Sequence, residues 1–185
     1  MDRASNNNNR NGQTLIEAMV AVTLLTVGFL GISSLLSQSL ALNRVTANQL
    51  TATYLAAEGI EVAKNLIDHD VYAQAAGHGT GWGTCLANLV SINGGFGLDY
   101  STVDCNPGSR QIFSSNDYLY YHADTHLYDY DENGGGGTQT GFMRKVTMIP
   151  TGNYEITVNS IVSWPGPAGT VDDVNLEDHF YNYGY

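Results

Sequence analysis

The sequence predicts an α+β fold in which one long N-terminal helix packs on a small antiparallel β-sheet. Two observations carry this prediction. Residues 14–67 contain no proline, and their apolar residues recur at helical spacing. Residues 117–183 instead consist of short aromatic and β-branched runs separated by turn residues. The chain of 185 residues is long enough for one domain of ordinary size with a small addition.

The first half of the expected helix is a candidate membrane span. No charged residue lies between Glu17 and Arg44, and residues 18–36 are dominated by Ala, Val, Leu, Ile and Phe. A helix of this length crosses a hydrocarbon layer about 30 Å thick. The alternative is a cleaved secretory signal, whose apolar core is shorter, about 7–15 residues, and is followed by small residues. Arg3 and Arg10 precede the segment, which predicts a cytoplasmic N-terminus.

The second half of the expected helix is amphipathic. Apolar and small residues recur there at spacings of mostly three and four, namely Val45, Ala52, Leu55, Gly59, Val62 and Leu66. We expect one helix from about Thr14 to Ile67, on the order of 80 Å long at 1.5 Å per residue. Residues 13–67 therefore form the helical part of the chain, and the stripe is the expected cover for one face of the sheet.

Residues 68–185 are expected to form a β-rich globular domain outside the membrane. Residues 77–108 are rich in Gly, Ser, Thr and Asn, which predicts an irregular loop region. In the run 154–164, Tyr154, Ile156, Val158, Val162 and Trp164 alternate with polar residues, which is typical of a half-buried antiparallel strand. The strands expected in this meander are 117–122, 126–130, 141–149, 154–164 and 171–183.

The charge is unevenly distributed. From Asp68 to the C-terminus there are 14 acidic and 3 basic residues, whereas residues 1–67 contain four of each, so the net charge of −11 belongs to the C-terminal part. Such an acidic surface repels phosphates. We therefore expect no nucleic acid partner.

The chain has two cysteines, Cys85 and Cys105, at either side of a glycine-rich loop. In an exported chain we expect them to form a disulfide, which would stabilise the fold by about 3 kcal/mol. The alternative is two free buried thiols. No C-x-x-C pair is present, so the sequence does not support a zinc site or a thioredoxin-like motif.

One loop offers a candidate calcium site. Residues 128–137 contain the pattern D-x-D-x-N-G, which places oxygen donors at Asp129, Asp131 and Asn133. An EF-hand requires a glutamate at its twelfth position, where this chain has Thr140, and the flanking helices are missing. The alternative is an acidic loop between strands, and no other cofactor is expected.

The sequence does not indicate an enzyme. His122 and His126 lie four residues apart, but Ala123 stands where a zinc protease motif needs glutamate, and the segment predicts a surface turn. No G-x-S-x-G motif, P-loop or dinucleotide-binding pattern is present. His179 has no evident partner. The many tyrosines of the sheet region favour sheet packing, with an aromatic binding surface as the alternative.

The N-terminal residues resemble those of type IV pilins and pseudopilins. The resemblance is carried by Gly12, Thr14, Leu15, Ile16 and Glu17, which follow a polar basic leader and precede the long uncharged run. The stretches YLAAEGIEVAKNLID, FMRKVTM and VNSIVSWPG are similar to minor pilins and pseudopilins, less specifically. The resemblance implies the type IV pilin fold and the role of a structural filament subunit.

The resemblance also implies how the N-terminus is used. A prepilin peptidase removes the leader, residues 1–12, after Gly12, and Gln13 becomes the N-terminal residue, which this family often methylates. Gln13 departs from the usual Phe or Met. Glu17 then pairs either with the amine of a neighbouring subunit, which sets the register of the filament, or with the amine of its own chain at i, i+4. Gly28 and Gly31 lie where filaments of this family show a locally unwound helix. Each glycine destabilises a helix by about 1 kcal/mol relative to alanine.

Partners and localisation follow from this resemblance. The expected partners are other pilin subunits, through the N-terminal helix, and the prepilin peptidase. The precursor is expected in the inner (cytoplasmic) membrane and the mature chain in a surface filament. A minor pilin that supports adhesion or twitching motility fits the resemblance best. The alternatives are a pseudopilin of type II protein secretion and a helix-anchored adhesin that does not polymerise.

Overall fold

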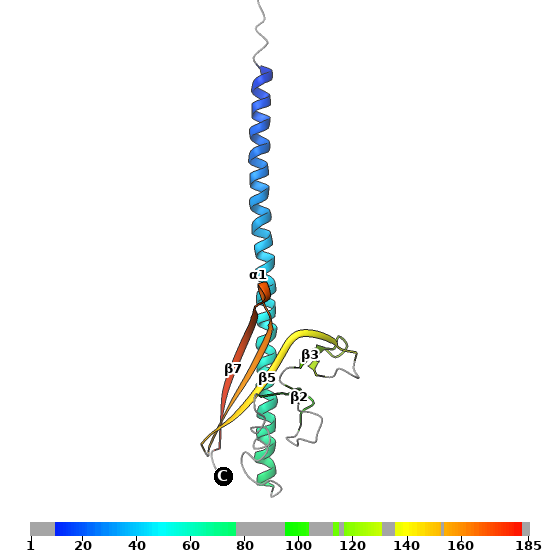
Figure 1. Ribbon diagram of the computed structural model, residues 1–185, viewed down its shortest axis with the longest axis vertical. Coiled ribbons are helices and arrows are strands. Elements are labelled where there is room, and N and C mark those ends of the chain that lie inside the picture. The colour runs from blue at the N-terminus through cyan, green and yellow to red at the C-terminus, as the bar shows by residue number, and fades with distance from the viewer. Residues whose placement is uncertain are drawn as a thin grey trace, which may run out of the picture. The chain divides into compact units, whose positions relative to one another are not determined.

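The computed structural model consists of two compact units, residues 1–46 and residues 47–185. The first unit is the N-terminal part of helix α1 (Arg10–Ala75), and the second contains the rest of α1 together with a β-sheet (Figure 1). The structure describes residues 10–76, 95–103, 113–114, 117–130, 136–152 and 154–182.

Helix α1 is longer at both ends than the sequence predicts. It begins at Arg10 rather than near Thr14, and it ends at Ala75 rather than at Ile67. The apolar stripe does stop at Ile67, but residues 68–76 contain no proline or glycine that would end the helix there. The polar residues after Ile67 are mostly exposed on the helix surface, so nothing interrupts the backbone hydrogen bonds there.

The sheet contains seven strands among the described residues, and all its pairings are antiparallel. The strands are β1 (Phe96–Gly97), β2 (Phe113–Ser114), β3 (Tyr118–Tyr121), β4 (Tyr128–Asp129), β5 (Thr138–Thr151), β6 (Glu155–Pro165) and β7 (Val171–Tyr181). A short 3-10 helix, η1 (Pro167–Gly169), joins β6 to β7.

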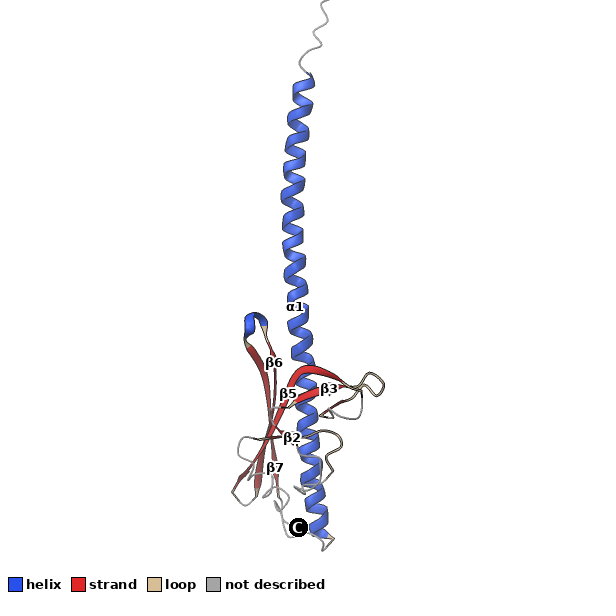
Figure 2. Ribbon diagram, turned by 45° about the vertical axis from the view of Figure 1, so that its right-hand side comes forward, coloured by secondary structure: helices blue, strands red, loops and turns tan. Residues whose placement is uncertain are grey.

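Strand β5 organises the sheet. One of its edges pairs with β6, which in turn pairs with β7, and these three strands form a meander (Figure 2). The other edge pairs with β3 and β1, which carry β4 and β2. The five predicted strands are confirmed, but they do not form one continuous meander, because β5 pairs with β3 and not with β4, the strand before it in the chain. β1 and β2 are additional strands that the sequence does not predict, because a strand of only two residues shows no periodicity.

Residues 47–75 of α1 cover one face of this sheet within the second unit (Figures 1 and 2). The predicted stripe is buried from Ala52 onward, and Ala56, Ala63 and Ile67 are buried beside it. On β6, Ile156, Val158, Val162 and Trp164 are buried as predicted, whereas Tyr154 precedes the strand and is exposed. The long helix packed on a small antiparallel sheet is therefore confirmed.

The core falls into two clusters. The first joins Val62, Ala63, Leu66 and Ile67 of α1 to Phe96, Leu98, Val146, Met148, Ile156 and Val158. The second joins Ala52, Leu55 and Ala56 of α1 to Leu119, Tyr130, Val162 and Trp164. Gly59, Arg144 and Ser160 lie between these clusters on α1, β5 and β6, respectively.

Gly59 allows the helix and the sheet to approach closely at this junction. A Cβ atom at Gly59 would lie 2.4 Å from Ser160 Oγ and 3.1 Å from Arg144 Cδ. Real Cβ atoms do not approach other heavy atoms to 2.4 Å. A glycine inside a helix costs about 1 kcal/mol relative to alanine, and here the close packing offsets that cost.

Arg144 is fully buried and joins three parts of the second unit. Its guanidinium donates to the Leu55 carbonyl at 3.0 Å and to the Leu98 carbonyl, and it lies 3.2 Å from the Glu58 carboxylate. The Tyr130 hydroxyl donates to the Arg144 carbonyl at 3.0 Å. Burial raises the pKa of Tyr130, so that hydroxyl stays protonated as a donor.

Candidate functional site: the N-terminal segment of helix α1

The N-terminal segment of α1, residues 13–46, is an apolar helix without a partner in its own unit. Its large apolar side chains are exposed, from 37% at Val45 to 71% at Leu25, although a soluble domain rarely leaves so many together in water. Among the described residues, α1 is the one helix long and apolar enough to cross a membrane, judged by length and composition. The segment therefore needs lipid or other protein around it.

Several hydroxyl groups within this segment form hydrogen bonds to the helix backbone. Thr23 and Thr26 each donate to the carbonyl three residues earlier, at 2.8 Å, and Ser37 donates to the Ser33 carbonyl at 3.0 Å. Bonded in this way, a hydroxyl costs little in an apolar environment. These three side chains are therefore compatible with lipid or with a packed helix bundle.

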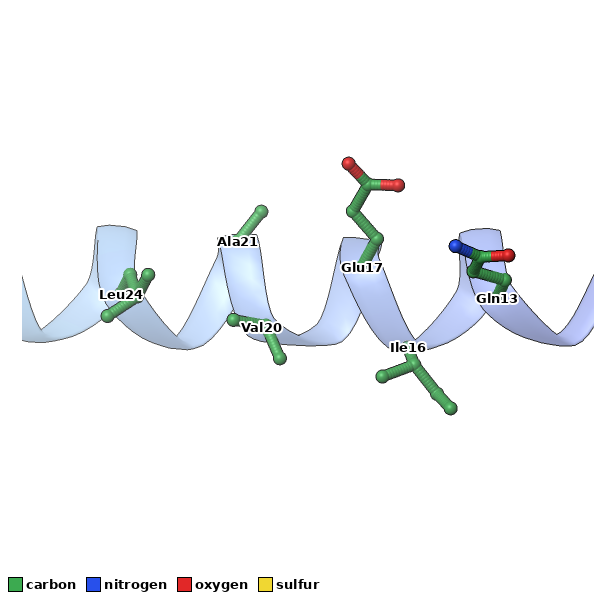
Figure 3. Close-up of a pocket in the computed structure, with 6 residues that line it drawn as sticks. All are labelled: Gln13, Ile16, Glu17, Val20, Ala21 and Leu24. Atoms are coloured by element: carbon green, nitrogen blue, oxygen red, sulfur yellow. The ribbon is translucent and has the colours of Figure 1, made fainter.

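Glu17 lies on an otherwise largely apolar face of the segment. Gln13, one turn earlier, and Ile16, Val20, Ala21 and Leu24 surround it on the helix surface; in the view of Figure 3, Glu17 and Ala21 point upward, and Ile16 and Val20 point downward. Glu17 is exposed and makes no hydrogen bond or ion pair with any described residue. A carboxylate that enters lipid or a helix bundle from this face needs a cation beside it.

The predicted cleavage position lies at the beginning of the same helix. Gly12 and Gln13 both belong to α1, which begins two residues before Gly12. Cleavage after Gly12 would leave the new amine at the N-terminal end of the remaining helix, one turn from Glu17. The geometry therefore places Gln13 and Glu17 together, as their spacing in the sequence requires.

Comparison with known families identifies this segment. Residues 7–33 match the family model described as the prokaryotic N-terminal methylation motif. This is the signature of type IV pilins and pseudopilins. The match includes Gly12, Gln13 and Glu17.

The pilin-like assignment accounts for the exposed helix. Proteins with this motif are structural rather than catalytic, are processed by a prepilin peptidase and assemble with other pilin subunits. The apolar helix is compatible with a membrane-anchored precursor. No curated protein and no solved structure matches the chain significantly.

The other predicted site residues are only partly described. Cys85 and Cys105 lie outside the described residues, so the disulfide stays a prediction. Asp131 and Asn133 of the candidate calcium loop also lie outside them. Asp129 is buried; one carboxylate oxygen lies 2.9 Å from His122 Nε2, and the other accepts a 3.5 Å hydrogen bond from Tyr100. The calcium hypothesis stays a prediction.

Two expectations about histidines need correction. Residues 123–125 form the predicted turn, but His122 is buried, because its ring bonds to Asp129 on the neighbouring strand β4. His179 is not isolated either. Its Nδ1 lies 2.6 Å from Glu155 and its Nε2 lies 3.2 Å from Glu177. The Asp129 and Glu155 contacts cross between strands, so spacing along the chain gave no signal for them.

Proposed function

We propose that this chain is a minor pilin, a subunit that enters a type IV pilus-like filament through residues 13–46. The observation that supports this proposal is the exposed apolar helix that begins at the methylation motif. On residues 47–75, one face of α1 is already buried against the chain's own sheet. The N-terminal segment is therefore the part of α1 that is free to pack on other subunits.

Assembly begins with cleavage of the precursor. The precursor spans the inner membrane with its basic leader in the cytoplasm, and the prepilin peptidase cuts between Gly12 and Gln13. The cut removes Arg3 and Arg10 and creates a new cation, the amine of Gln13. Methylation of this amine retains its charge, so the pairing described below applies with or without it.

The carboxylate of Glu17 then pairs with the amine of a neighbouring subunit. When the Glu17 face packs on another helix, an unpaired carboxylate is costly, since breaking a buried ion pair costs about 3–5 kcal/mol. Only a subunit in the correct axial position places its amine beside Glu17. The pair therefore selects the register, whereas the apolar side chains around it provide most of the burial.

The experiment compares Glu17→Ala with Glu61→Ala, a control on the same helix whose side chain is 63% exposed. We expect both variants to lose the leader, as shown by mass spectrometry of the mature N-terminus. Glu17→Ala should be depleted about tenfold or more from sheared filaments, the change that corresponds to about 1.4 kcal/mol. Incorporation at the wild-type level would contradict the proposed role of Glu17.

A second measurement separates the neighbouring amine from the amine of the same chain. If Glu17 pairs with the amine of its own chain, this pair is already present in a processed monomer held in detergent micelles. Glu17→Ala would then change the titration curve of the Gln13 amine, followed by NMR. If the pair forms between subunits, the monomeric wild type and Glu17→Ala give the same curve.

Mass spectrometry of sheared filaments also tests which kind of subunit the chain is. A small share of the filament supports a minor pilin that contributes to adhesion or motility. If cells that lack the gene instead fail to secrete proteins that they normally export, the chain is a pseudopilin of type II secretion. Recovery only as a membrane-anchored monomer would indicate an adhesin that does not polymerise, for which neither Gly12 nor Glu17 has a role.

A further inference from the structure

Strand β7 offers a long open edge. All of its residues from Val171 to Tyr181 are paired with β6 in an unbroken register, and no described strand pairs with its other side (Figures 1 and 2). Its two ends are exposed, with 67% of Val171 and 49% of Tyr181 accessible. An exposed edge of this length is a template for an added strand unless the protein blocks it.

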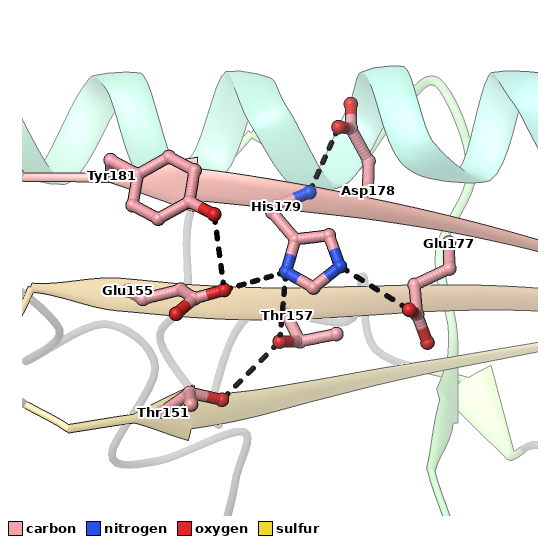
Figure 4. A network of polar contacts seen from close by, with 7 residues as sticks. All are labelled: Thr151, Glu155, Thr157, Glu177, Asp178, His179 and Tyr181. Carbon is pink, nitrogen blue, oxygen red and sulfur yellow. Dashed lines mark hydrogen bonds and ion pairs between the residues drawn. The ribbon is translucent and has the colours of Figure 1, made fainter.

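The backbone register shows which groups face the open side. The amide of Asn182 donates to the Tyr154 carbonyl at 2.8 Å, so in this antiparallel ladder even-numbered residues of β7 bond to β6. The N–H groups of Asp173, Asn175 and Glu177 therefore point away from β6. The N–H of His179 also points away, but it donates to the carboxylate of Asp178, the preceding residue, at 2.8 Å (Figure 4).

The edge is thus closed at one end and open at the other. Asp178 occupies the amide of His179, which would otherwise bond to an incoming strand. No hydrogen bond within the described residues occupies the amides of Asp173, Asn175 and Glu177. An added strand would pair with β7 over residues 171–177.

The side chains of this open stretch define the chemistry of the partner. Val174 and Leu176 are half-buried at the margin of the core, so apolar side chains of an added strand would cover them. Asp173 and Glu177 lie on the opposite, exposed face, where Glu177 also bonds to His179 (Figure 4). Opposite charges on paired strands stabilise a sheet, and like charges destabilise it.

A second copy of this chain does not fit the edge. Pairing β7 with another β7 would bring its four carboxylates, those of Asp172, Asp173, Glu177 and Asp178, close to four more. We propose that residues 171–177 bind a strand of a different protein in which lysine or arginine alternates with apolar residues. The strand adds to β7 with its cations beside Asp173 and Glu177, and this binding does not depend on assembly through α1.

The test uses the full-length chain in detergent micelles and a nine-residue peptide in which valine and lysine alternate. We expect the peptide to bind with a Kd below about 1 mM and to bind more weakly as the salt concentration rises. Binding should slow hydrogen exchange in residues 171–177. Two peptides serve as controls: one alternates valine and glutamate, and the other has the first peptide's composition with all lysines together. Neither should protect β7.

Variants of the edge separate backbone pairing from general attraction. Asn175→Pro removes an amide that faces the open side and leaves the β6 ladder intact, so it should weaken binding about tenfold, whereas Asn175→Ala should change it less than about twofold. The double change Asp173→Asn, Glu177→Gln should reduce both the affinity and its salt dependence. It should leave hydrogen exchange of unbound β7 unchanged.

Several results would overturn the proposal. The proposal is wrong if the alternating peptide shows no binding with a Kd below about 1 mM, or if the peptide with clustered lysines binds equally well. It is also wrong if the alternating peptide binds without slowing hydrogen exchange in residues 171–177. Dimers of the wild-type chain with the same protection, and without peptide, would show that a second copy is the partner instead. If Asn175→Pro unfolds, the exchange data on the wild type and the charge variant still decide the question.

Discussion

Helix α1 contains two segments that differ in the exposure of their large apolar side chains. In residues 13–46, Leu25 and Phe29 are 71% and 67% exposed, whereas in residues 47–75, Leu55 and Leu66 are 3% and 1% exposed. The second segment has a sheet from its own chain on one face, and the first has none, so the stability of the first depends on lipid or on other subunits.

The glycines differ in the same way. A Cβ atom at Gly28 or Gly31 would meet nothing within 4 Å, whereas one at Gly59 would collide with Ser160. Gly59 is therefore explained by packing within the chain. Gly28 and Gly31 have no such explanation in their own unit, which is consistent with a role for them only after assembly.

The largest expected effect comes from removing a core leucine from the second segment. Leu66→Ala should lower the free energy of unfolding of the second unit by about 3–5 kcal/mol, because it leaves a cavity between α1 and the sheet. Leu25→Ala should change it by less than about 0.5 kcal/mol. Urea unfolding in detergent micelles, followed by tryptophan fluorescence, measures both. Equal effects of the two substitutions would contradict the difference between the segments.

Arg144 should give the next largest effect. Arg144→Ala leaves the carbonyl groups of Leu55 and Leu98 without their donor and should cost about 3 kcal/mol in the same unfolding experiment. Lys145→Ala, at the adjacent position on the opposite face of β5, is the control and should cost less than about 0.5 kcal/mol. If Arg144→Ala costs less than about 1 kcal/mol, Arg144 does not hold the second segment to the sheet.

Substitution by alanine should destabilise the fold at Gly59 and stabilise the helix of the monomer at Gly28. Gly59→Ala gains about 1 kcal/mol of helix propensity but forces Ser160 and Arg144 apart, for a net loss of about 1 kcal/mol. Gly28→Ala should slow hydrogen exchange in residues 13–46 of the monomer, because the site is open. The same substitution should reduce incorporation into filaments if the helix unwinds there. Stabilisation by Gly59→Ala would show that the junction is loosely packed.

The sequence alone could predict the parts of the fold that repeat. The stripe on α1 and the alternation on β6 both follow a period, and both are confirmed. Arg144 was not predicted to be buried, because a charged residue in a strand usually faces solvent. Its burial depends on the Leu55 and Leu98 carbonyls, which come from distant parts of the chain. The end of α1 was wrong because the stripe stops before the helix does.

The candidate site was more predictable than the core, because it is local. Gly12, Gln13 and Glu17 lie within six consecutive residues of one helix, so their spacing alone fixes their geometry. The partners of His122 and His179 required knowledge of strand pairing. His179 provides the smallest of the expected effects, and it has no counterpart in residues 13–46, which contain no histidine.

The pKa of His179 is raised above 6.5, first by its hydrogen bond to Glu155 and then by that to Glu177. The protonated ring is therefore stabilised in the folded state. This contribution is fully present below about pH 6.5 and is lost as the pH rises through the raised pKa of the folded state. The wild type should lose slightly more stability over that range than His179→Gln, as measured by urea unfolding at a series of pH values. Because the ring is exposed, the effect is small, and NMR titration is the more sensitive measurement. Glu155→Gln should return the pKa of His179 toward 6.5, and an unchanged value would show that Glu155 does not hold the proton.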